Sequence, residues 1–309
     1  MLPPSPGSSR SRAGGATRTS RAPCWGAQTR HADRPRADGY HLPVGRRKRR
    51  APRCGRHRGV EIAVTGGTGS AGAHVVRELA AAGHAVRVLS RRPPREPVPG
   101  TRHFAVDQAT GSGLREALDD AEVVVDAMNS SKPGVLLPAT RTLLDAVHTA
   151  GVGHYVGISI VGIERVPLGY YRAKLQQEEA IKAGPVAWSL LRATQFHSLI
   201  AALLAAADRF RVTPLPSARV QPVDPREVAR ELAARAVGEP TRQTAQLGGP
   251  EIVTLGALAR AWRRKTGRRG ARVPLPLPPL GPVRALRAGG LTDPSIPRGR
   301  VTFAEWLSR

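Results

Sequence analysis

Cysteine is nearly absent from this sequence. Its 309 residues include two, Cys24 and Cys54, and both lie in the first 59 residues. The rest of the chain therefore has no thiol with which to build a disulfide, a zinc site or a cysteine nucleophile. We expect no metal site, and a reducing, cytoplasmic setting fits this composition best.

Long hydrophobic runs are also absent. The longest, residues 199–207, has nine residues, whereas a helix needs about 20 to cross a bilayer. No membrane span is therefore expected. The chain is 40% hydrophobic, which allows a sizeable core for one large domain or two modest ones.

Acidic residues are few, and the resulting excess of positive charge is uneven. The formal net charge is +25, with +13 in residues 1–59 and +12 in residues 60–309. Of the 48 basic residues 43 are Arg, a skew that a GC-rich genome also produces. Neither basic cluster, at residues 46–50 or 260–269, is accompanied by a recognition motif, so nucleic acid is not an expected partner.

Residues 1–59 are rich in Pro, Gly, Ser and Arg and show no apolar periodicity. Such a segment buries too little surface to offset the entropy lost on ordering, so we interpret it as a disordered tail. The alternatives are an organelle transit peptide and a nuclear address or phosphate-binding cluster at residues 46–50. A mis-assigned start is another, because the ordered pattern begins abruptly at Val60 and a valine codon can initiate bacterial translation.

The ordered pattern opens with a strand, a glycine-rich loop and a helix. Residues 60–64 form a β-branched run typical of a buried parallel strand, and residues 73–82 have the period of a helix. The loop between them contains Gly66, Thr68, Gly69, Ser70 and Gly72. Glycines so placed let main-chain N–H groups approach a diphosphate at a helix N-terminus. We predict a dinucleotide-binding loop; the alternative is a glycine-rich turn without a ligand.

The second expected strand, residues 85–89, is followed by Ser90, Arg91 and Arg92. An NAD-binding protein usually has an acidic residue here, which binds the ribose hydroxyls. Arginine instead forms charge-assisted hydrogen bonds with a 2′-phosphate, so the sequence favours NADP(H) over NAD(H). The alternative is that both arginines are ordinary surface residues.

Strands and helices alternate further along the chain. Strands are expected at residues 102–107, 122–126, 152–158 and 185–191, and helices at residues 112–118 and 136–150. Repeated β-α-β units predict an α/β fold with a doubly wound parallel sheet, the Rossmann fold, whose ligand lies at the carboxyl ends of the strands. There Asp107 would accept a hydrogen bond from adenine, and Met128 and Asn129 would line the same cleft.

Tyr170 and Lys174 follow the fifth strand at a spacing of i and i+4, which places them on one face of a helix. A nearby ammonium lowers the pKa of a phenol toward the range useful for proton transfer. We therefore predict that Tyr170 is a general acid, that Lys174 contacts the cofactor and that Ser159 orients a substrate carbonyl. Tyr171 in place of Tyr170, or a helix without catalytic function, is the alternative.

The C-terminal part is expected to complete the substrate region. Gln195 and Phe196 follow the sixth strand and are candidate substrate contacts, whereas a histidine such as His197 beside an apolar helix is more often structural. Helix 198–207 is nearly all Ala and Leu and is expected to be buried, in this domain or against a partner chain. The remaining expected elements are helices 224–237, 255–265 and 280–287, strand 243–247 and an extended connector at 273–279.

Together these motifs resemble the atypical short-chain dehydrogenase/reductases, most of all their NmrA-like and NAD(P)H-binding, azoreductase-like branch. Besides the loop at 65–72, the residues after the second strand and the Tyr170 to Lys174 pair, the resemblance includes residues 154–159 and 191–196. It covers residues 60 to about 290.

The resemblance implies a Rossmann domain over residues 60–309, with residues 192–309 contributing a small substrate region. It also implies an NADP(H) site at Gly66, Gly69, Gly72, Arg91 and Lys174. Because this branch contains both reductases and nucleotide-sensing regulators, two functions are expected. One is an NADPH-dependent oxidoreductase acting on a small carbonyl, quinone or similar acceptor, and the other is a non-catalytic NADP(H) sensor. The oligomeric state is left open.

Overall fold

The computed structural model describes residues 59–130, 132–208, 212–215, 218–267, 271–274 and 281–309. Gly55–Arg309 forms one compact unit of the chain. The predicted tail with its basic cluster, and most of the predicted proline-rich connector, lie outside the described residues. None of the helices in the described part is long and apolar enough to cross a membrane.

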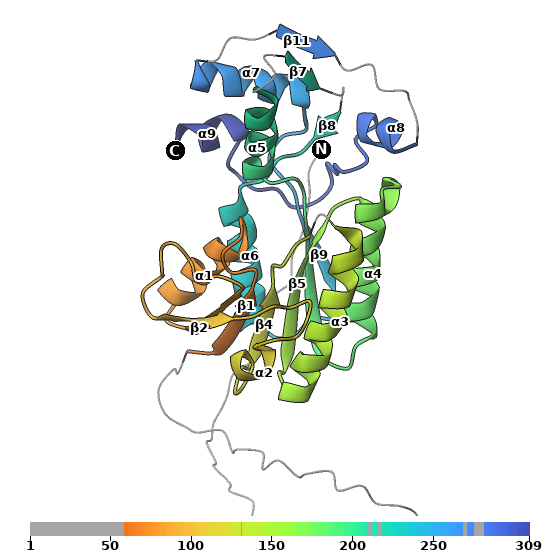
Figure 1. The fold of residues 1–309 in the computed structure, drawn as a ribbon. Helices are drawn as coiled ribbons and strands as arrows, with labels where there is room; N and C mark the ends of the chain where they lie inside the picture. The colour runs from red at the N-terminus through yellow and green to blue at the C-terminus, as the bar shows by residue number, and fades with distance from the viewer. Residues whose placement is uncertain (1–58, 131, 209–211, 216–217, 268–270, 275–280) are drawn as a thin grey trace, which may run out of the picture. The chain divides into compact units, whose positions relative to one another are not determined.

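A parallel sheet of seven strands forms the centre of the fold (Figure 1). Its strands, in chain order, are β1 (Glu61–Thr65), β2 (Ala85–Ser90), β3 (Thr101–Ala105), β4 (Val123–Asp126), β5 (His154–Ile160), β6 (Ala187–Ala193) and β9 (Thr244–Leu247). In space they lie in the order β3-β2-β1-β4-β5-β6-β9, and every pairing is parallel. This confirms the predicted doubly wound α/β fold.

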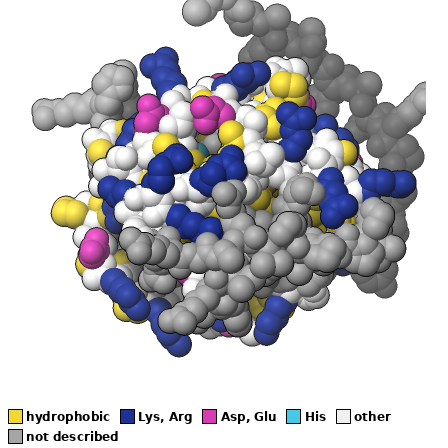
Figure 2. Space-filling model, turned by 90° about the horizontal axis from the view of Figure 1, so that it is seen from above, with side chains coloured by type: hydrophobic (Ala, Val, Ile, Leu, Met, Phe, Trp, Pro, Cys, Tyr) yellow, Lys and Arg dark blue, Asp and Glu magenta, His cyan; other side chains and the backbone are white. Residues whose placement is uncertain are grey.

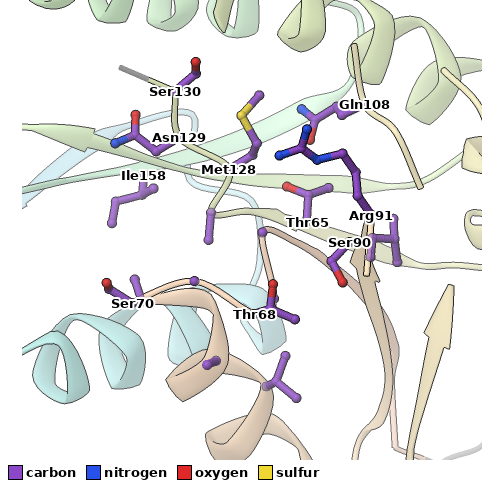
Figure 3. A pocket seen from close by; sticks show the side chains of 18 of the residues that line it. Thr65, Thr68, Ser70, Ser90, Arg91, Gln108, Met128, Asn129, Ser130 and Ile158 are labelled. Carbon is purple, nitrogen blue, oxygen red and sulfur yellow. The ribbon is translucent and has the colours of Figure 1, made fainter. Parts of the chain in front are cut away.

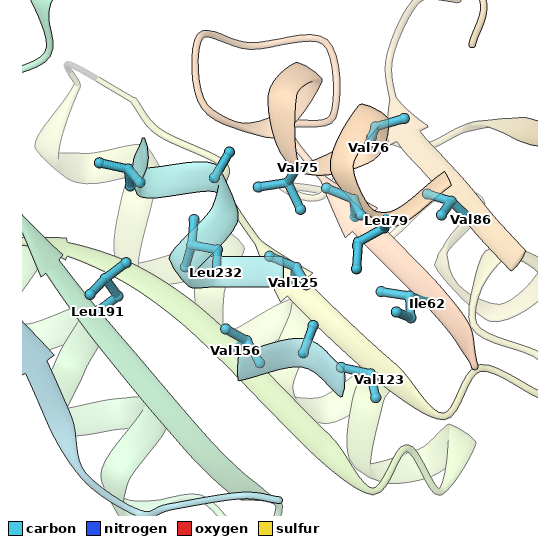
Figure 4. Packing of buried hydrophobic residues seen from close by; sticks show 14 of the residues in the cluster. Ile62, Val75, Val76, Leu79, Val86, Val123, Val125, Val156, Leu191 and Leu232 are labelled. Carbon is cyan, nitrogen blue, oxygen red and sulfur yellow. The ribbon is translucent and has the colours of Figure 1, made fainter. Parts of the chain in front are cut away.

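One face of the sheet is covered by α1 (Gly72–Ala81) and α6 (Pro225–Val237). Figure 4 shows Val75 and Leu79 of α1 packed toward Ile62 of β1, with Leu232 of α6 beside them. The residues between, such as Ala63 on β1, point to the other face. Both faces are therefore apolar, which explains why the strands appear in the sequence as continuous hydrophobic runs.

The opposite face is covered by α2 (Leu114–Ala117), α3 (Pro133–Ala150) and α4 (Gly169–Ala183), with a short 3₁₀ helix, η1 (Ile163–Arg165), before α4. Leu143 and Val147 of α3 are fully buried there beside Tyr155 of β5. Burying each such aliphatic side chain contributes about 1.5–3 kcal/mol. Packing against α3 and the sheet thereby fixes the position of α4, and the candidate catalytic residues lie at the start of this helix.

The remaining elements gather beyond the carboxyl ends of the strands (Figure 1). They are α5 (His197–Ala207), β7 (Val212–Leu215), β8 (Arg219–Val220), β10 (Val253–Thr254), α7 (Leu255–Thr266), β11 (Ala271–Pro274), α8 (Gly281–Arg287) and α9 (Phe303–Ser308). β10 pairs with β8, and β11 pairs with β7. We call these elements the cap; α5, α7 and α9 share its hydrophobic cluster.

Residues 192–309 are divided between the cap and the Rossmann sheet. Helix α6 begins at Pro225 after the N-cap Asp224, whose carboxylate accepts a hydrogen bond from the N–H of Arg226 at 2.9 Å. It packs on the sheet beside α1, and the following strand β9 pairs with β6 at the sheet edge. The chain therefore leaves the cap and returns to it, which the sequence analysis did not anticipate.

Helix α5 is only half buried. Ile200, Ala201 and Leu204 belong to the core of the cap, but Leu199 and Leu203 are 50% and 57% exposed. The helix is therefore only partly buried within this chain, and burial against a partner chain stays a prediction. The exposed side that carries Leu199 lines the cleft at the carboxyl ends of the sheet strands.

The last turn of α7 carries Arg263, Arg264 and Lys265. Cations at this end of a helix complement its dipole. Figure 2 shows that Lys and Arg side chains are spread over the upper face of the molecule, with a few acidic side chains between them. This distribution agrees with an Arg-rich composition.

Candidate functional site

A cleft of about 1620 Å³ lies at the carboxyl ends of the sheet strands. It is lined by the segments that follow β1, β2, β3, β4 and β6, by the end of β5, by the start of α4 and by one side of α5. Every predicted site residue except Gly72 lines it: Gly66, Thr68, Gly69, Ser70, Arg91, Arg92, Asp107, Met128, Asn129, Ser159, Tyr170, Lys174, Gln195 and Phe196.

The glycine loop is held in place by close backbone contacts. Gly66 has φ +60°, and a Cβ there would lie 2.7 Å from the carbonyl oxygen of Ala127, in the loop after β4. A Cβ at Gly72 would lie 2.2 Å from the carbonyl oxygen of Gly66. Gly72 therefore packs the start of α1 against the loop and is not among the residues that line the cleft.

The loop surface facing the cleft is backbone and small polar side chains. Thr68, Gly69 and Ser70 are exposed there, and the N–H of Gly69 donates to the carbonyl oxygen of Gly66 at 2.8 Å. In Figure 3, Thr68 and Ser70 lie on one side of the pocket and Met128 and Asn129 on another. A cradle that a Cβ would fill, at the N-terminus of a helix, fits a diphosphate.

Arginines dominate the end of the cleft beside β2. Arg91 and Arg92 are exposed and line it, and Figure 3 shows Arg91 extending from the end of β2 into the pocket. Arg77 and Arg95, which the sequence analysis did not single out, line it as well. Glu96 also lines this end, and it pairs with Arg77 at 3.9 Å.

Asp107 lies at the same end of the cleft, after β3. One of its carboxylate oxygens accepts a hydrogen bond from the N–H of Ala109 at 2.9 Å, so that it stabilises its own turn. The neighbouring Gln108, which also lines the cleft, is 8% exposed, and its amide donates to the carbonyl oxygen of Ala139.

At the other end of the cleft, Tyr170 and Asn129 are joined directly. The phenol of Tyr170 donates a hydrogen bond to Asn129 Oδ1 at 2.9 Å. Burial raises the pKa of Tyr170, and the Asn129 hydrogen bond offsets this only in part. Lys174 does not contribute to this shift, so the expected lowering of the Tyr170 pKa by Lys174 is wrong for this arrangement. Tyr171 packs on Tyr170 with ring centroids 5.3 Å apart, and burial raises its pKa to about 12.

Lys174 is 2% exposed and lines the floor of the cleft. Its ammonium donates to the carbonyl oxygen of Ile158 at 3.1 Å and to Gln177 Oε1 at 2.8 Å. Burial lowers the pKa of Lys174 to about 8, although the carboxylates of Asp126 and Glu178 oppose this shift. A buried ammonium at this point is protonated at neutral pH and can bind a polar group in the cleft.

Ser159 lines the same cleft as Tyr170. Strand β5 continues through Ile160, two residues beyond its predicted end, and Ser159 is 3% exposed. Among the described residues its hydroxyl has no regular hydrogen-bond partner. Burial opposes ionisation of the nearby Glu178, but hydrogen bonds and the charge of Arg192 lower the pKa of Glu178 overall. The role of Ser159 toward a substrate carbonyl stays a prediction.

Gln195 has both polar atoms engaged in the fold. Its Nε2 donates to the carbonyl oxygen of Leu291 at 3.0 Å, and its Oε1 accepts from the N–H of Gln221 at 3.0 Å. It lines the cleft while joining β6 to the cap. Phe196 lines the cleft beside it, together with Ser198, Leu199 and Ala202 of α5.

His197 is fully buried and structural, as the sequence analysis favoured. Its Nε2 lies 2.9 Å from the carbonyl oxygen of Val301, and its ring packs against both Phe303 and Trp306 of α9. Among the described residues no group of three or more His, Cys, Asp or Glu side chains is arranged to hold a metal ion.

Comparison with known proteins agrees with this site. Residues 66–211 match the model of the NAD(P)H-binding family. No match was found among curated proteins.

Solved structures with the same fold include NAD(P)-dependent enzymes. The NADPH-dependent quinone oxidoreductase of Escherichia coli in complex with NADPH is 22% identical, with a TM-score of 0.64 over 80% of this chain and 98% of that one. A nucleoside-diphosphate-sugar epimerase from Staphylococcus aureus is 16% identical, with a TM-score of 0.67 over 81% and 100%. The UDP-glucose 4-epimerase of Thermotoga maritima is 17% identical, with a TM-score of 0.63 over 80% and 96%.

At these identities the structures establish the fold, and the family match over residues 66–211 supports NAD(P)H binding. The glycine loop and the cleft lie at the carboxyl ends of the parallel strands, which is where Rossmann proteins bind dinucleotides. The chain therefore has a Rossmann-type fold, in which residues 66–211 match an NAD(P)H-binding domain.

Proposed function

We propose that this protein is an NADPH-dependent oxidoreductase that reduces a small carbonyl, quinone or similar acceptor. The observation that carries the proposal is that one cleft contains both the glycine loop and the Tyr170 to Lys174 pair. The loop fits a diphosphate, and the pair supplies a phenol and an ammonium at the opposite end. A binding protein without turnover would need only the first of these.

The preference for NADPH rests on charge. Four arginines line the cleft at the end of β2 or beside it: Arg77, Arg91, Arg92 and Arg95. The two acidic residues there are already engaged, Glu96 with Arg77 and Asp107 with the backbone of Ala109. Guanidinium groups favour a 2′-phosphate, which a carboxylate after β2 would repel.

When bound, the nicotinamide supplies a hydride to the acceptor. Lys174 then fixes the ribose end through its ammonium, and the Tyr170 phenol gives a proton to the acceptor oxygen. Because burial raises the pKa of Tyr170, the phenol keeps its proton at neutral pH and is in the form that can donate it. To act, it must exchange its hydrogen bond with Asn129 for one with the acceptor.

The walls of this end of the cleft favour a flat, uncharged acceptor. Phe196, Leu199, Ala202 and Tyr171 line it, and no acidic side chain lies among the described residues of this end. Apolar and aromatic walls with a few polar groups are typical of sites for small organic ligands. A quinone fits this description, and the Escherichia coli neighbour is named for that substrate.

A non-catalytic NADP(H) sensor of the NmrA-like type is the second candidate. It is favoured by the partners of two predicted catalytic or substrate groups. The Tyr170 phenol is bonded to Asn129, and Gln195 is engaged at both polar atoms. Such a protein would bind NADPH in the same cleft without oxidising it.

One experiment separates the candidates. The purified full chain is titrated with NADPH and NADH, and oxidation of NADPH is then followed with a panel of quinones and carbonyl compounds. Turnover that depends on an acceptor supports the oxidoreductase. Tight NADPH binding without turnover supports the sensor, and binding of neither nucleotide contradicts both.

A further inference from the structure

A network of buried side chains lies beneath the cleft, centred on Asp126 at the end of β4. This carboxylate is 2% exposed. Its Oδ1 accepts hydrogen bonds from the hydroxyl of Thr65 and from the N–H of Met128, and its Oδ2 accepts from the phenol of Tyr155 at 2.6 Å and from Gln177 Nε2 at 3.4 Å. A group that only accepts, at both oxygens, has the hydrogen-bonding pattern of an ionised carboxylate.

Gln177 connects this carboxylate to Lys174. Its Nε2 donates to Asp126 and also to the hydroxyl of Thr140 at 3.0 Å. That hydroxyl in turn donates to the carbonyl oxygen of Leu136, so it can only accept from Gln177. The amide is thereby fixed in one orientation, with its Oε1 turned toward the Lys174 ammonium at 2.8 Å.

Lys174 is held from below by two acceptors. Ile158 and Gln177 take two of its three ammonium protons, and the side chain lines the cleft above. A buried ammonium needs a compensating negative charge, because burial disfavours the charged form.

Two carboxylates lie near Lys174, and their situations differ. Glu178 is paired with Arg192 at 2.8 Å and with Lys182 at 3.1 Å. Among the described residues Asp126 forms no ion pair with a Lys or Arg, and its carboxylate is held by hydrogen bonds from neutral donors. The other titratable groups facing this region are the phenols of Tyr155, Tyr170 and Tyr171.

From this arrangement we infer that Asp126 and Gln177 are positioning residues, which fix the Lys174 ammonium at the floor of the cleft and stabilise its positive charge. The inference goes beyond the proposed function in assigning these two residues, and it rests on that function only for the role of Lys174 toward the cofactor. Asp126 acts through the charge of its carboxylate, and Gln177 through the fixed direction of its amide.

The first experiment measures the protonation of Lys174 without any cofactor. The sequence has five lysines, so ¹³C-labelled lysine gives few signals, and the Lys174 signal is identified by its loss in Lys174→Arg. In the native protein we expect it to titrate near pH 8. Asp126→Asn should lower this midpoint by about one unit, because an opposite charge is removed. An unchanged midpoint in a folded Asp126→Asn protein would overturn the inference.

Gln177→Met and Ser189→Ala complete the test. Gln177→Met removes one acceptor from Lys174 and should lower the same midpoint and weaken NADPH binding about tenfold at pH 7. Ser189, 1% exposed and hydrogen-bonded to His154, lies in the same sheet. Ser189→Ala removes a comparable buried hydrogen bond and should change neither quantity.

The outcomes separate this inference from the proposed function. If NADPH does not bind the native protein, the proposed function fails, whereas the titration of Lys174 still tests Asp126 and Gln177. If NADPH binds and both variants match Ser189→Ala in midpoint and affinity, the network only stabilises the fold and the inference is wrong. Should Asp126→Asn fail to fold, the inference is tested with Gln177→Met alone, by the Lys174 titration midpoint and by NADPH affinity.

Discussion

The phenol of Tyr170 and the ammonium of Lys174 are one helical turn apart in the sequence, yet they have separate partners. Tyr170 donates to Asn129, in the segment after β4, whereas Lys174 donates to Ile158 of β5 and to Gln177 of α4. At the scale of single residues, function therefore depends on neighbours from other strands. Spacing predicts that two side chains share a helix face, but it does not predict which third residue binds each of them.

Replacement of Tyr170 by Phe tests its role as proton donor. Turnover should fall by about 10²–10⁴-fold, the usual contribution of a general acid, while NADPH affinity stays the same. Steady-state kinetics and calorimetric titration measure the two quantities. Tyr171→Phe is the matched control. Turnover that survives in Tyr170→Phe but is lost in Tyr171→Phe would transfer the role to the neighbouring phenol.

The lowered pKa of Lys174 predicts how NADPH binding depends on pH. The ammonium is mostly charged at neutral pH and loses its proton as the pH rises through its pKa of about 8. NADPH affinity should therefore be constant in the neutral range and decline as the pH rises through this value. Binding isotherms from pH 6 to pH 10 show the decline, and Lys174→Met should abolish it. A profile that is equally steep in Lys174→Met would assign the pH dependence to another group.

Arg91 is expected to select the cofactor. Arg91→Ala should weaken NADPH binding by about tenfold or more, since a charge-assisted hydrogen bond contributes about 1.5–3 kcal/mol, and should leave NADH binding nearly unchanged. Competition titrations with both nucleotides provide the comparison. Arg102 on β3 is exposed and does not line the cleft, so Arg102→Ala serves as the control. Equal losses for NADPH and NADH would mean that Arg91 does not bind the 2′-phosphate.

At the scale of elements, the turn between β1 and α1 depends on close packing that only glycine permits. A Cβ at Gly72 would overlap the carbonyl oxygen of Gly66, whereas Gly134, near the start of α3, has no atom within 4 Å of such a Cβ. The two positions therefore form a pair in which the same substitution should have opposite consequences.

Gly72→Ala should lower the free energy of unfolding by about 1–3 kcal/mol, because the backbone must shift to relieve the overlap, and should abolish tight NADPH binding. Gly134→Ala lies in a helix and should leave stability unchanged or raise it by about 0.5–1 kcal/mol. Urea denaturation gives both values. If the two variants unfold alike, the contact between Gly66 and Gly72 does not hold the loop.

Elements with a strong local pattern could be predicted from the sequence. The β-branched runs give the central strands to within two or three residues, and the Asp224-Pro225 pair marks the start of α6. The orientation of Ser159 could not be predicted, because it depends on how far β5 continues, which neighbouring strands decide. The two-stranded sheets of the cap are too short to show a period. Helix α9 was not predicted, although the Thr302 and Glu305 capping box was an available signal for it.

The positioning role of Asp126 was missed for a related reason. In the sequence it is only the polar end of a valine-rich run, 48 residues before Lys174 along the chain. The sheet order brings β4 beside β5, and Gln177 spans the remaining gap. Gln177 lies three residues after Lys174, on the same helix face, and this spacing was the available clue.

At the scale of the whole molecule, the site follows from the strand order. The chain passes from β1 to β2 and β3 on one side and then to β4 on the other, so the loops after β1 and β4 diverge at the carboxyl edge of the sheet. This switch point is where Rossmann proteins bind dinucleotides. The cap adds α5 over the same edge, and Leu199, exposed on its surface, becomes part of the cleft wall.

The central claim is that this cleft binds NADPH, and calorimetric titration of the full chain with NADPH and NADH at neutral pH tests it most directly. The account predicts one nucleotide bound per chain, with NADPH bound more tightly than NADH and the difference lost in Arg91→Ala. Absence of binding for both nucleotides in a folded protein would contradict the account.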